Sequence, residues 1–307
     1  MTHPIDAVGF NAAAPNGDLA ALGRVLDRQV ELGCEACELT AATLDAVADC
    51  RLVPARVDAV RRTLAPYRLR WTLHAPIPIN LMDEDHRDWQ LRAATAALEL
   101  GDALDARTVV LHPGRVHPGR WAEARDDLLA RERETLFALG ERARALGVVV
   151  AYENLSPNPK VVAGAETSYA LDPAALAAQL DALDHPHVRA CLDVSHAQQG
   201  AGLLGFELHA AVARLGPWIA HLHFSDSTGV PLTIANDGRP ETMHWFGAGD
   251  MHAPPGWGRI DFAGMARATR ARPGSAMIIE LRPNVRTHAE AATLAAARSF
   301  AAAVTPA

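Results

Sequence analysis

Histidines and acidic residues stand at the ends of short apolar runs between residues 74 and 280. The run TLHAP carries His74, VVLHPG carries His112, and VAYENL carries Glu153. Later runs and one loop add more, and the full set is His74, His112, Glu153, Asp193, His196, His223, Asp250, His252 and Glu280. Imidazole nitrogens and carboxylate oxygens are the ligands that Zn²⁺ and Mn²⁺ take in proteins. If the fold brings these residues together, they predict a divalent-metal site.

Each of these residues, taken alone, also has an ordinary structural explanation. A lone histidine in a protein interior is more often a hydrogen-bonded structural residue, and a glutamate at the end of a strand can pair with an arginine. The set as a whole favours a metal site, because burying several carboxylates together without cations would be costly.

The apolar runs are typical of strands in a parallel sheet. They are rich in Val, Ile and Leu and alternate with longer segments of helical period. Eight strands are predicted, over residues 7–10, 36–39, 69–74, 108–112, 148–153, 188–193, 219–224 and 277–280. Helices are predicted over 18–32 and 121–146, each ended by a glycine that can supply a left-handed cap. Asp172 before Pro173 has the pattern of a helix N-cap.

Eight strand-then-helix units within 307 residues predict an α/β fold, the (β/α)8 TIM barrel, as a single domain. A doubly wound sheet usually has about five or six strands and a glycine-rich first turn, and no G-x-G-x-x-G follows the first run here. Chemistry in a TIM barrel lies at the C-terminal ends of the strands, where the nine residues would meet. The irregular stretch 225–260 is too long for an ordinary connection and is interpreted as a lid or a site-building insertion.

Composition excludes several classes of protein. The net charge of −7 and the scattered basic residues give no footprint of a protein that binds nucleic acid or an anionic membrane. No stretch reaches the roughly 18 apolar residues of a membrane span, and the first residues do not resemble a secretion signal, so we expect a cytoplasmic protein. Cys34 and Cys37 form a C-x-x-C with no second pair or nearby histidine, which does not predict a metal site.

The motifs, in their order along the chain, resemble those of the xylose isomerase-like TIM-barrel superfamily, in the branch that includes endonuclease IV and sugar phosphate isomerases or epimerases. The shared motifs are HAP, HPG, EN, D-x-x-H, H-x-x-D, D-x-H-x-x-x-G-x-G and a final strand-end E, over residues 69–282. The endonuclease IV pattern implies three metal ions. Their ligands would be His74, His112 and Glu153 for the first, Glu153, Asp193, His223 and Glu280 for the second, and His196, Asp250 and His252 for the third.

The epimerases of the superfamily imply a different chemistry on the same barrel. By position they use only Glu153, Asp193, His223 and Glu280 around one divalent ion, and the two glutamates move a proton of a bound ketose. Three ions would instead clamp a phosphoester, activate a water and stabilise the leaving oxygen.

The full set of nine residues contains a third triad that an epimerase does not need. The sequence therefore favours phosphoester hydrolysis of a small sugar-like or phosphorylated substrate, with isomerisation or epimerisation as the alternative. A DNA-repair enzyme of the AP-endonuclease type is a second alternative, which the acidic charge disfavours. Zinc, manganese, iron or cobalt would each suit these ligands, in one to three ions.

Further residues are candidates for contact with a small-molecule substrate. Three arginines follow predicted strands, and arginine forks suit phosphate or carboxylate groups. An asparagine beside Glu153 is a candidate for orienting that carboxylate, and two tryptophans of the insertion suit a loop that folds over a ligand. These candidates are Arg115, Arg120, Arg282, Asn154, Trp245 and Trp257.

The seventh predicted strand carries two histidines, in HLHFSD. The H-x-x-D motif of the superfamily fits His223 and Asp226, which makes His223 the expected ligand, with Asp226 as a candidate support. His221 has the same side-chain parity and should lie deeper in the barrel, where we expect it to hydrogen-bond or support the site. Glu38, at the end of the second strand, is either part of the pocket lining or a plain strand-end carboxylate.

Overall fold

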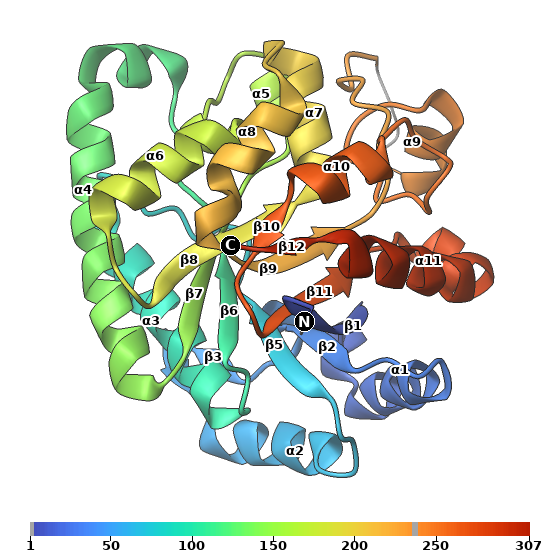
Figure 1. Cartoon of the computed structure of the whole chain (residues 1–307). Coiled ribbons are helices and arrows are strands. Elements are labelled where there is room, and N and C mark those ends of the chain that lie inside the picture. Colours follow the sequence, from blue (N-terminus) through green and yellow to red (C-terminus); the bar gives the residue numbers. More distant parts are fainter. Residues whose placement is uncertain (1–2, 235–238) are drawn as a thin grey trace.

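Eight parallel strands close into a barrel with helices around it, which confirms the predicted fold (Figure 1). The computed structural model describes residues 3–234 and 239–307. The order around the barrel is β1, β11, β9, β8, β7, β6, β5 and β2. Their bounds are β1 Ile5–Ala12, β2 Ala36–Thr40, β5 Arg70–His74, β6 Thr108–Leu111, β7 Val149–Glu153, β8 Val188–Asp193, β9 Ile219–Phe224 and β11 Ser275–Ile279.

The helices lie between the strands and begin and end at recognisable signals. The larger ones are α1 Leu19–Glu31, α2 Pro54–Leu64, α3 Arg87–Ala103, α4 Pro118–Leu146, α6 Pro173–Leu183, α7 Val194–Leu204, α8 Leu208–Leu215 and α11 Pro283–Ala303; the shorter ones are α5 Pro159–Val162, α9 Pro240–Phe246 and α10 Phe262–Ala268. Asp172 caps α6, as the sequence predicts, and Asp18 caps α1. Gly147 ends α4 in the left-handed conformation, with φ of 68°. Among the described residues, no helix is both long and apolar enough to cross a membrane.

Two short strand pairs, β3 Val47–Ala48 with β4 Arg51–Leu52 and β10 Arg270–Ala271 with β12 Thr305–Pro306, lie outside the barrel. Element boundaries differ from the prediction by a few residues. Helix α4 begins three residues early, because His117 accepts a hydrogen bond from the Gly119 amide and Pro118 suits the first turn. His112 and Glu280 each come just after their strand rather than within it.

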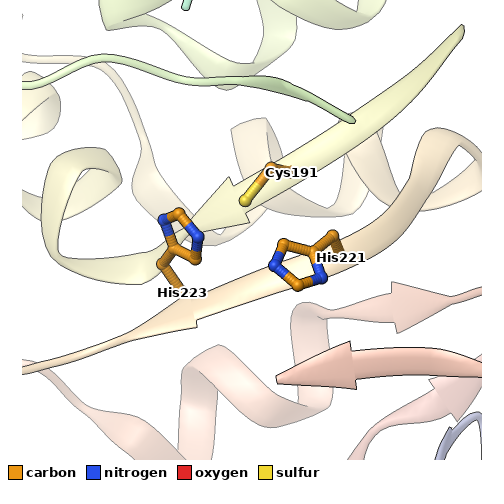
Figure 2. Close-up of side chains that lie close together, drawn as sticks. All are labelled: Cys191, His221 and His223. Carbon is orange, nitrogen blue, oxygen red and sulfur yellow. The ribbon is translucent and has the colours of Figure 1, made fainter. Parts of the chain in front are cut away.

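The barrel interior is partly polar. Residues two apart on a strand point to the same side, so each strand-end residue has an interior neighbour two positions earlier. Below Asp193 and His223 lie Cys191 and His221, which are paired in register and completely buried (Figure 2). Glu38 on β2 faces the same interior and is also completely buried. Polar side chains therefore take part of the place of the usual branched aliphatic filling of a TIM barrel, beside aliphatic residues such as Val110 and Ile278.

The insertion 225–260 is attached to the barrel through Asp226. Its carboxylate accepts hydrogen bonds from the backbone amides of Gly256 at 2.7 Å and Gly258 at 2.9 Å, and also from those of Ser227 and Ile260. A Cβ on Gly258 would lie 2.3 Å from Asp226 Oδ1, so this position requires glycine. Asp226 thus fixes the two ends of the insertion to each other rather than supporting His223.

A buried glutamate of α4 fixes the loop that follows β6. Glu132 Oε1 accepts hydrogen bonds from the Tyr152 hydroxyl at 2.6 Å and the Gly114 amide at 3.0 Å. Its Oε2 accepts from the Tyr169 hydroxyl at 2.6 Å and from Gln179 at 3.1 Å. Burial raises the pKa of Glu132, and these donors oppose that rise. Because Gly114 lies two residues after His112, this network positions the sequence HPG at the site.

We expect Glu132→Ala to lower the free energy of unfolding by at least about 3 kcal/mol, because it leaves four buried donors without an acceptor. Urea denaturation followed by circular dichroism would measure the loss. Glu134→Ala, on the same helix but with an exposed side chain paired to Arg87, is the control and should change stability by about 0.5 kcal/mol or less. Equal stability of the two variants would contradict this account.

Candidate metal centre

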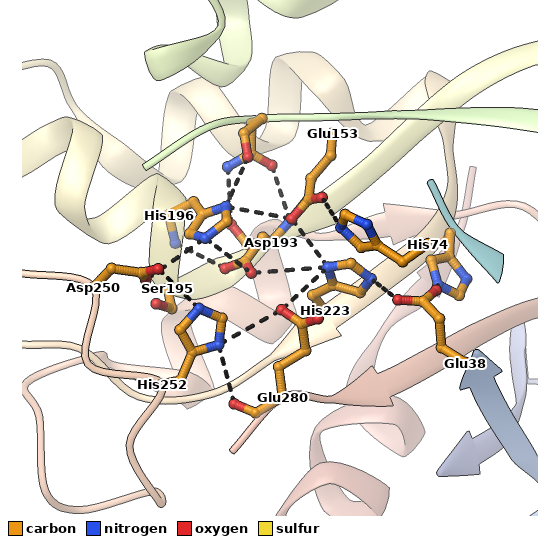
Figure 3. Close-up of polar contacts among 12 residues, drawn as sticks. Glu38, His74, Glu153, Asp193, Ser195, His196, His223, Asp250, His252 and Glu280 are labelled. Atoms are coloured by element: carbon orange, nitrogen blue, oxygen red, sulfur yellow. Dashed lines mark hydrogen bonds and ion pairs between the residues drawn. The ribbon is translucent and has the colours of Figure 1, made fainter. Parts of the chain in front are cut away.

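All nine predicted ligands come together at the C-terminal end of the barrel, and Figure 3 labels all of them except His112. Strand ends supply most of them, the first turn of α7 supplies His196, and the insertion supplies Asp250 and His252. Their donor atoms form three groups, within each of which the atoms lie no more than 4.8 Å apart. The groups are His74, His112 and Glu153; Glu153, Asp193, His223 and Glu280; and His196, Asp250 and His252. This is the grouping that the resemblance implies, and the binding of metal by it stays a prediction.

Glu153 is the centre of the cluster. Its Oε2 lies 3.0 Å from His112 Nε2 and 3.4 Å from His74 Nε2. Its Oε1 lies 3.0 Å from His223 Nδ1 and 3.3 Å from His196 Nδ1. One carboxylate thus serves two sides, as a bridging ligand would.

The D-x-x-H motif is a helix cap that also directs two ligands. Asp193 is the N-cap of α7, and its Oδ1 accepts a hydrogen bond from the His196 amide at 2.8 Å. The cap leaves Asp193 Oδ2 directed at the cluster, 3.6 Å from His196 Nε2 and 3.9 Å from His223 Nδ1. The spacing of the motif therefore follows from the geometry of a helix start.

Backbone carbonyls select which ring nitrogen faces the cluster. Three histidines place Nδ1 against a carbonyl oxygen, which as an acceptor requires the proton on Nδ1 and leaves the lone pair on Nε2. The pairs are His74 with Ala75 at 2.8 Å, His196 with Asn154 at 3.0 Å, and His252 with Glu280 at 3.2 Å. The free Nε2 atoms each face at least one carboxylate, as metal ligation requires. His196 Nδ1 and His252 Nδ1 also lie near carboxylates, 3.3 Å from Glu153 Oε1 and 3.5 Å from Glu280 Oε2.

The third group is built by the insertion. His252 Nε2 lies 2.9 Å from Asp250 Oδ2, and Asp250 Oδ1 lies 3.6 Å from His196 Nε2. His252 has a left-handed backbone with φ of 43°, an uncommon conformation for a residue other than glycine. Arg282 donates to the Asp250 carbonyl at 2.6 Å and holds this turn against the barrel.

The charges of the cluster perturb its ionisation strongly. Burial raises the pKa of Asp193 to about 6, against the opposing effect of His196. Burial also opposes ionisation of Glu153, but the neighbouring His223 and His112 hold the pKa of that carboxyl well below its usual range. Burial opposes protonation of His74 and His196 as well, yet contacts chiefly with Glu153 and Asp193 raise their pKa values to about 9 and about 10. The four carboxylates of the ligand groups therefore need nearby positive charge to be stable in this buried site.

Glu38 belongs to the site, which its place in the sequence left open. Its Oε2 lies 2.9 Å from His221 Nε2 and accepts a hydrogen bond from Thr72 at 3.0 Å, and its Oε1 lies 3.0 Å from His223 Nε2. His221 is completely buried below His223, in the deeper position that its parity predicts. The signal in the sequence was the even spacing of Glu38 from the interior residue Ala36.

Three of the six candidate substrate-binding residues lie near the ligand groups or have an unpartnered polar atom. Asn154 is buried and exchanges two hydrogen bonds of 2.9 Å with the backbone of Asp193, so it orients that neighbour rather than Glu153. Arg115 is half-buried, and its Nε has no hydrogen-bond partner among the described residues. Arg282 remains 30% exposed beside Asp250.

Three other candidates are not brought to the cluster. Arg120 pairs with Glu84 through two contacts of 2.6 and 2.7 Å. Trp245 is 87% exposed, and Trp257 is 49% exposed with its ring edge against His244. A role for these three in substrate binding stays a prediction.

A hollow of about 300 Å³ opens beside the cluster. Its lining includes Glu280 and His74 of the cluster and the segment 76–78, in which Ile77 is 62% exposed. No lysine or arginine is among its described lining residues, which are Asn11, Glu38, Thr40, Ala42, His74, Ala75, Pro76, Ile77, Pro78 and Glu280. The hollow therefore suits an uncharged group that has both hydroxyls and an apolar face.

A model of the family described as the xylose isomerase-like TIM barrel matches residues 26–302. The chain belongs to this family. The match confirms the expected resemblance and extends it toward the N-terminus, through strand β2 and into α1, where the motifs carried little of it.

Relatives of this xylose isomerase-like barrel occur in mycobacteria. Uncharacterized proteins of Mycobacterium tuberculosis and Mycobacterium bovis are each 29% identical to it over 190 residues. The match covers 57% of this chain and 61% of each relative. The chain thus matches about three fifths of the length of these curated relatives.

Solved structures share the barrel over nearly the whole chain. A D-tagatose 3-epimerase-like protein has a TM-score of 0.67 at 19% identity, covering 96% of this chain and 97% of its own. A Thermus thermophilus protein soaked with ZnCl2 has a TM-score of 0.61 at 22% identity, covering 97% and 98%. D-psicose 3-epimerase in the presence of D-fructose has a TM-score of 0.63 at 16% identity, covering 97% of each chain. At these identities the similarity shows the fold.

The donor set of this xylose isomerase-like barrel fits divalent cations. Asp193 Oδ2 is buried with no hydrogen-bond partner in the described part of the chain, although it faces three other donor groups. A buried carboxylate oxygen without a partner is costly, and a cation would satisfy it. Four carboxylates and five histidines, with ring nitrogens already directed inward, provide the oxygen and nitrogen ligands for one to three such ions.

Proposed function

We propose that this protein is a divalent-metal-dependent isomerase or epimerase that acts on a small, sugar-like substrate. The observation that carries the proposal is the position of Glu280, which belongs both to the central ligand group and to the lining of the hollow. A substrate in the hollow would therefore place its carbons beside a carboxylate of the metal site. Glu153 lies in the same ligand group, so two carboxylates are available for proton transfer.

The chemistry would be the movement of one proton on a hydroxy-ketone. Asp193, His223, Glu153 and Glu280 would hold the central ion, which would polarise the carbonyl and hydroxyl oxygens of the substrate. One glutamate then accepts the proton from the carbon beside the carbonyl, and the C–H electron pair moves toward the carbonyl oxygen. The other glutamate, protonated at that stage, returns a proton either to the opposite face of that carbon or to the former carbonyl carbon. In the second case the hydroxyl proton of the first carbon passes to the former carbonyl oxygen, so that the carbonyl group changes place. The first outcome is epimerisation and the second is isomerisation.

Two lines of support favour this function over the phosphoester hydrolysis that the sequence favoured. Similar solved structures include a D-tagatose 3-epimerase-like protein and D-psicose 3-epimerase. The hollow is lined by Glu38 and Glu280 but by no lysine or arginine among the described residues, so it offers a phosphate no fixed guanidinium or ammonium partner and suits a neutral sugar better. We propose zinc as the first ion to test, with manganese, iron and cobalt as alternatives.

Phosphoester hydrolysis remains the second candidate because the third ligand group is fully assembled. His196, Asp250 and His252 would hold an ion that the proton transfer above does not require. Arg115, with its unpartnered Nε, would then be the candidate contact for an anionic substrate.

The double substitution Asp250→Ala and His252→Ala distinguishes the two functions. We expect it to remove one bound ion while proton exchange stays within about threefold of wild type, because the central group is intact. Proton exchange would be measured by mass spectrometry as solvent deuterium entering D-fructose, D-tagatose or D-psicose, and the ions by elemental analysis.

The control is Asp83→Ala with His86→Ala, a hydrogen-bonded Asp–His pair that belongs to none of the three ligand groups and should keep every ion. The proposed function fails if wild-type protein exchanges no carbon-bound proton of these ketoses yet releases phosphate from a sugar phosphate, and if the double variant loses that release.

A further inference from the structure

The interior layer below the cluster contains a carboxylate, that of Glu38, which takes no part in the proposed proton transfer. Glu38 approaches His223 from the side opposite the cluster, and its Oε1 lies 3.0 Å from His223 Nε2. On the cluster side, His223 Nδ1 lies 3.0 Å from Glu153 Oε1 and 3.5 Å from Glu280 Oε2. The imidazole of His223 is thus placed between Glu38 and the ligands of the central group (Figure 3).

We propose that Glu38 is a positioning residue that fixes the ring of His223 so that Nδ1 binds the central ion. The inference rests on the proposed metal site. Histidines that bind metals commonly donate their second ring N–H to a carboxylate, which sets the tautomer and makes the ligand nitrogen more basic. His223 Nε2 and Glu38 Oε1 have no aligned hydrogen-bond partner among the described residues, so each is available to the other.

The rest of the layer holds Glu38 in place. Its second oxygen, Oε2, accepts a hydrogen bond from Thr72 at 3.0 Å and lies 2.9 Å from His221 Nε2. Only Oε1 is left to face His223. Glu38, His221 and His223 are completely buried, so little solvent screens the attraction between the carboxylate and the ring. His221 therefore acts on the site through Glu38, which explains why strand β9 carries two histidines.

The same layer has a second interpretation, which the experiment must separate. Donor atoms of Cys191, His221 and His223 lie within 4.8 Å of one another and could themselves surround an ion (Figure 2). A structural zinc site takes four protein ligands, and this group offers three. An ion there would also occupy the space between His223 and its neighbours and compete with Glu38 for the ring. We therefore favour the positioning role.

The test is a Zn²⁺ titration of chelator-stripped protein in competition with a chromophoric chelator, together with Co²⁺ absorption spectra that report ligand geometry. We expect Glu38→Gln to weaken binding at the central site by about 10- to 100-fold and to change the Co²⁺ spectrum. Thr72→Val keeps the carboxylate but removes one of its supports, and we expect a smaller loss. Glu31→Gln, on α1 with an exposed side chain, is the matched control and should bind as wild type does.

Several results would overturn the inference. Wild-type affinity and an unchanged Co²⁺ spectrum in Glu38→Gln, with only a lower melting temperature of the stripped protein, would show a merely structural role. Loss of one equivalent of ion in Cys191→Ser would assign the layer to an ion of its own. If Glu38→Gln does not fold, wild-type affinity in Thr72→Val decides against the inference. Wild-type protein that binds no divalent ion would instead refute the proposed function, and this inference with it.

Discussion

Replacing Glu153 with glutamine is expected to lower kcat/KM for ketose proton exchange by at least about 1000-fold. The substitution keeps the shape of the side chain and removes its charge. In the structure both carboxylate oxygens are used, because Oε2 faces His74 and His112 while Oε1 faces His196 and His223. An amide can offer one oxygen as a ligand but cannot bridge two ions, and it cannot accept a proton from carbon.

Two losses therefore combine in this variant. A missing acid–base group alone costs about 100- to 10,000-fold, and a weakened central ion removes further stabilisation of the developing negative charge. Deuterium incorporation into the ketose, measured in samples quenched at fixed times, gives the activity. Elemental analysis should show that fewer ions remain bound. Glu134→Gln, on the exposed face of α4, is the control and should retain full activity. An activity within tenfold of wild type in Glu153→Gln would rule out the central role of this carboxylate.

The sequence predicts the barrel and the cluster because both follow from local rules. Strand periodicity identifies eight runs, and the rule that barrel strands present their C-terminal ends on one face brings together residues as distant as His74 and Glu280. The N-cap geometry at Asp193 places His196 one turn later, which the D-x-x-H spacing already contains. No long-range information is needed for these steps.

The remaining features depend on contacts that local rules do not contain. Glu38 meets His221 across the barrel interior, 183 residues away in the chain, so its role follows only once the barrel closes. Asp226 shares the motif that points to His223, yet its carboxylate turns to the backbone amides of Gly256 and Gly258, which have no other acceptor assigned. Arg120, in the first turn of α4, likewise pairs with Glu84, which lies in the loop before α3. Which partner each of these side chains contacts depends on competition between groups that are close only in the folded protein.

Removal of metal should abolish proton exchange and destabilise the fold together, because the same carboxylates serve both. A ligand that binds only the folded state at about 1000 times its dissociation constant contributes about 4 kcal/mol of stability. We therefore expect chelation to lower the free energy of unfolding by about that amount for each tightly bound ion, and the melting temperature by on the order of 10 °C. Calorimetry of loaded and stripped protein would measure this, and re-addition of Zn²⁺, Mn²⁺ or Co²⁺ would identify the active ion.

The variant without the third ligand group provides an internal control for this experiment. Chelation should lower the free energy of unfolding of the Asp250→Ala, His252→Ala variant less than that of wild type, because the variant binds one ion fewer. Its exchange activity should still disappear on chelation, because the central group of Glu153, Asp193, His223 and Glu280 is unchanged. The expectation is wrong if stripped wild-type protein has the melting temperature of the metal-loaded protein and still exchanges protons. In that case protonated histidines, whose pKa values the neighbouring carboxylates raise, balance the charge of the cluster in place of bound ions.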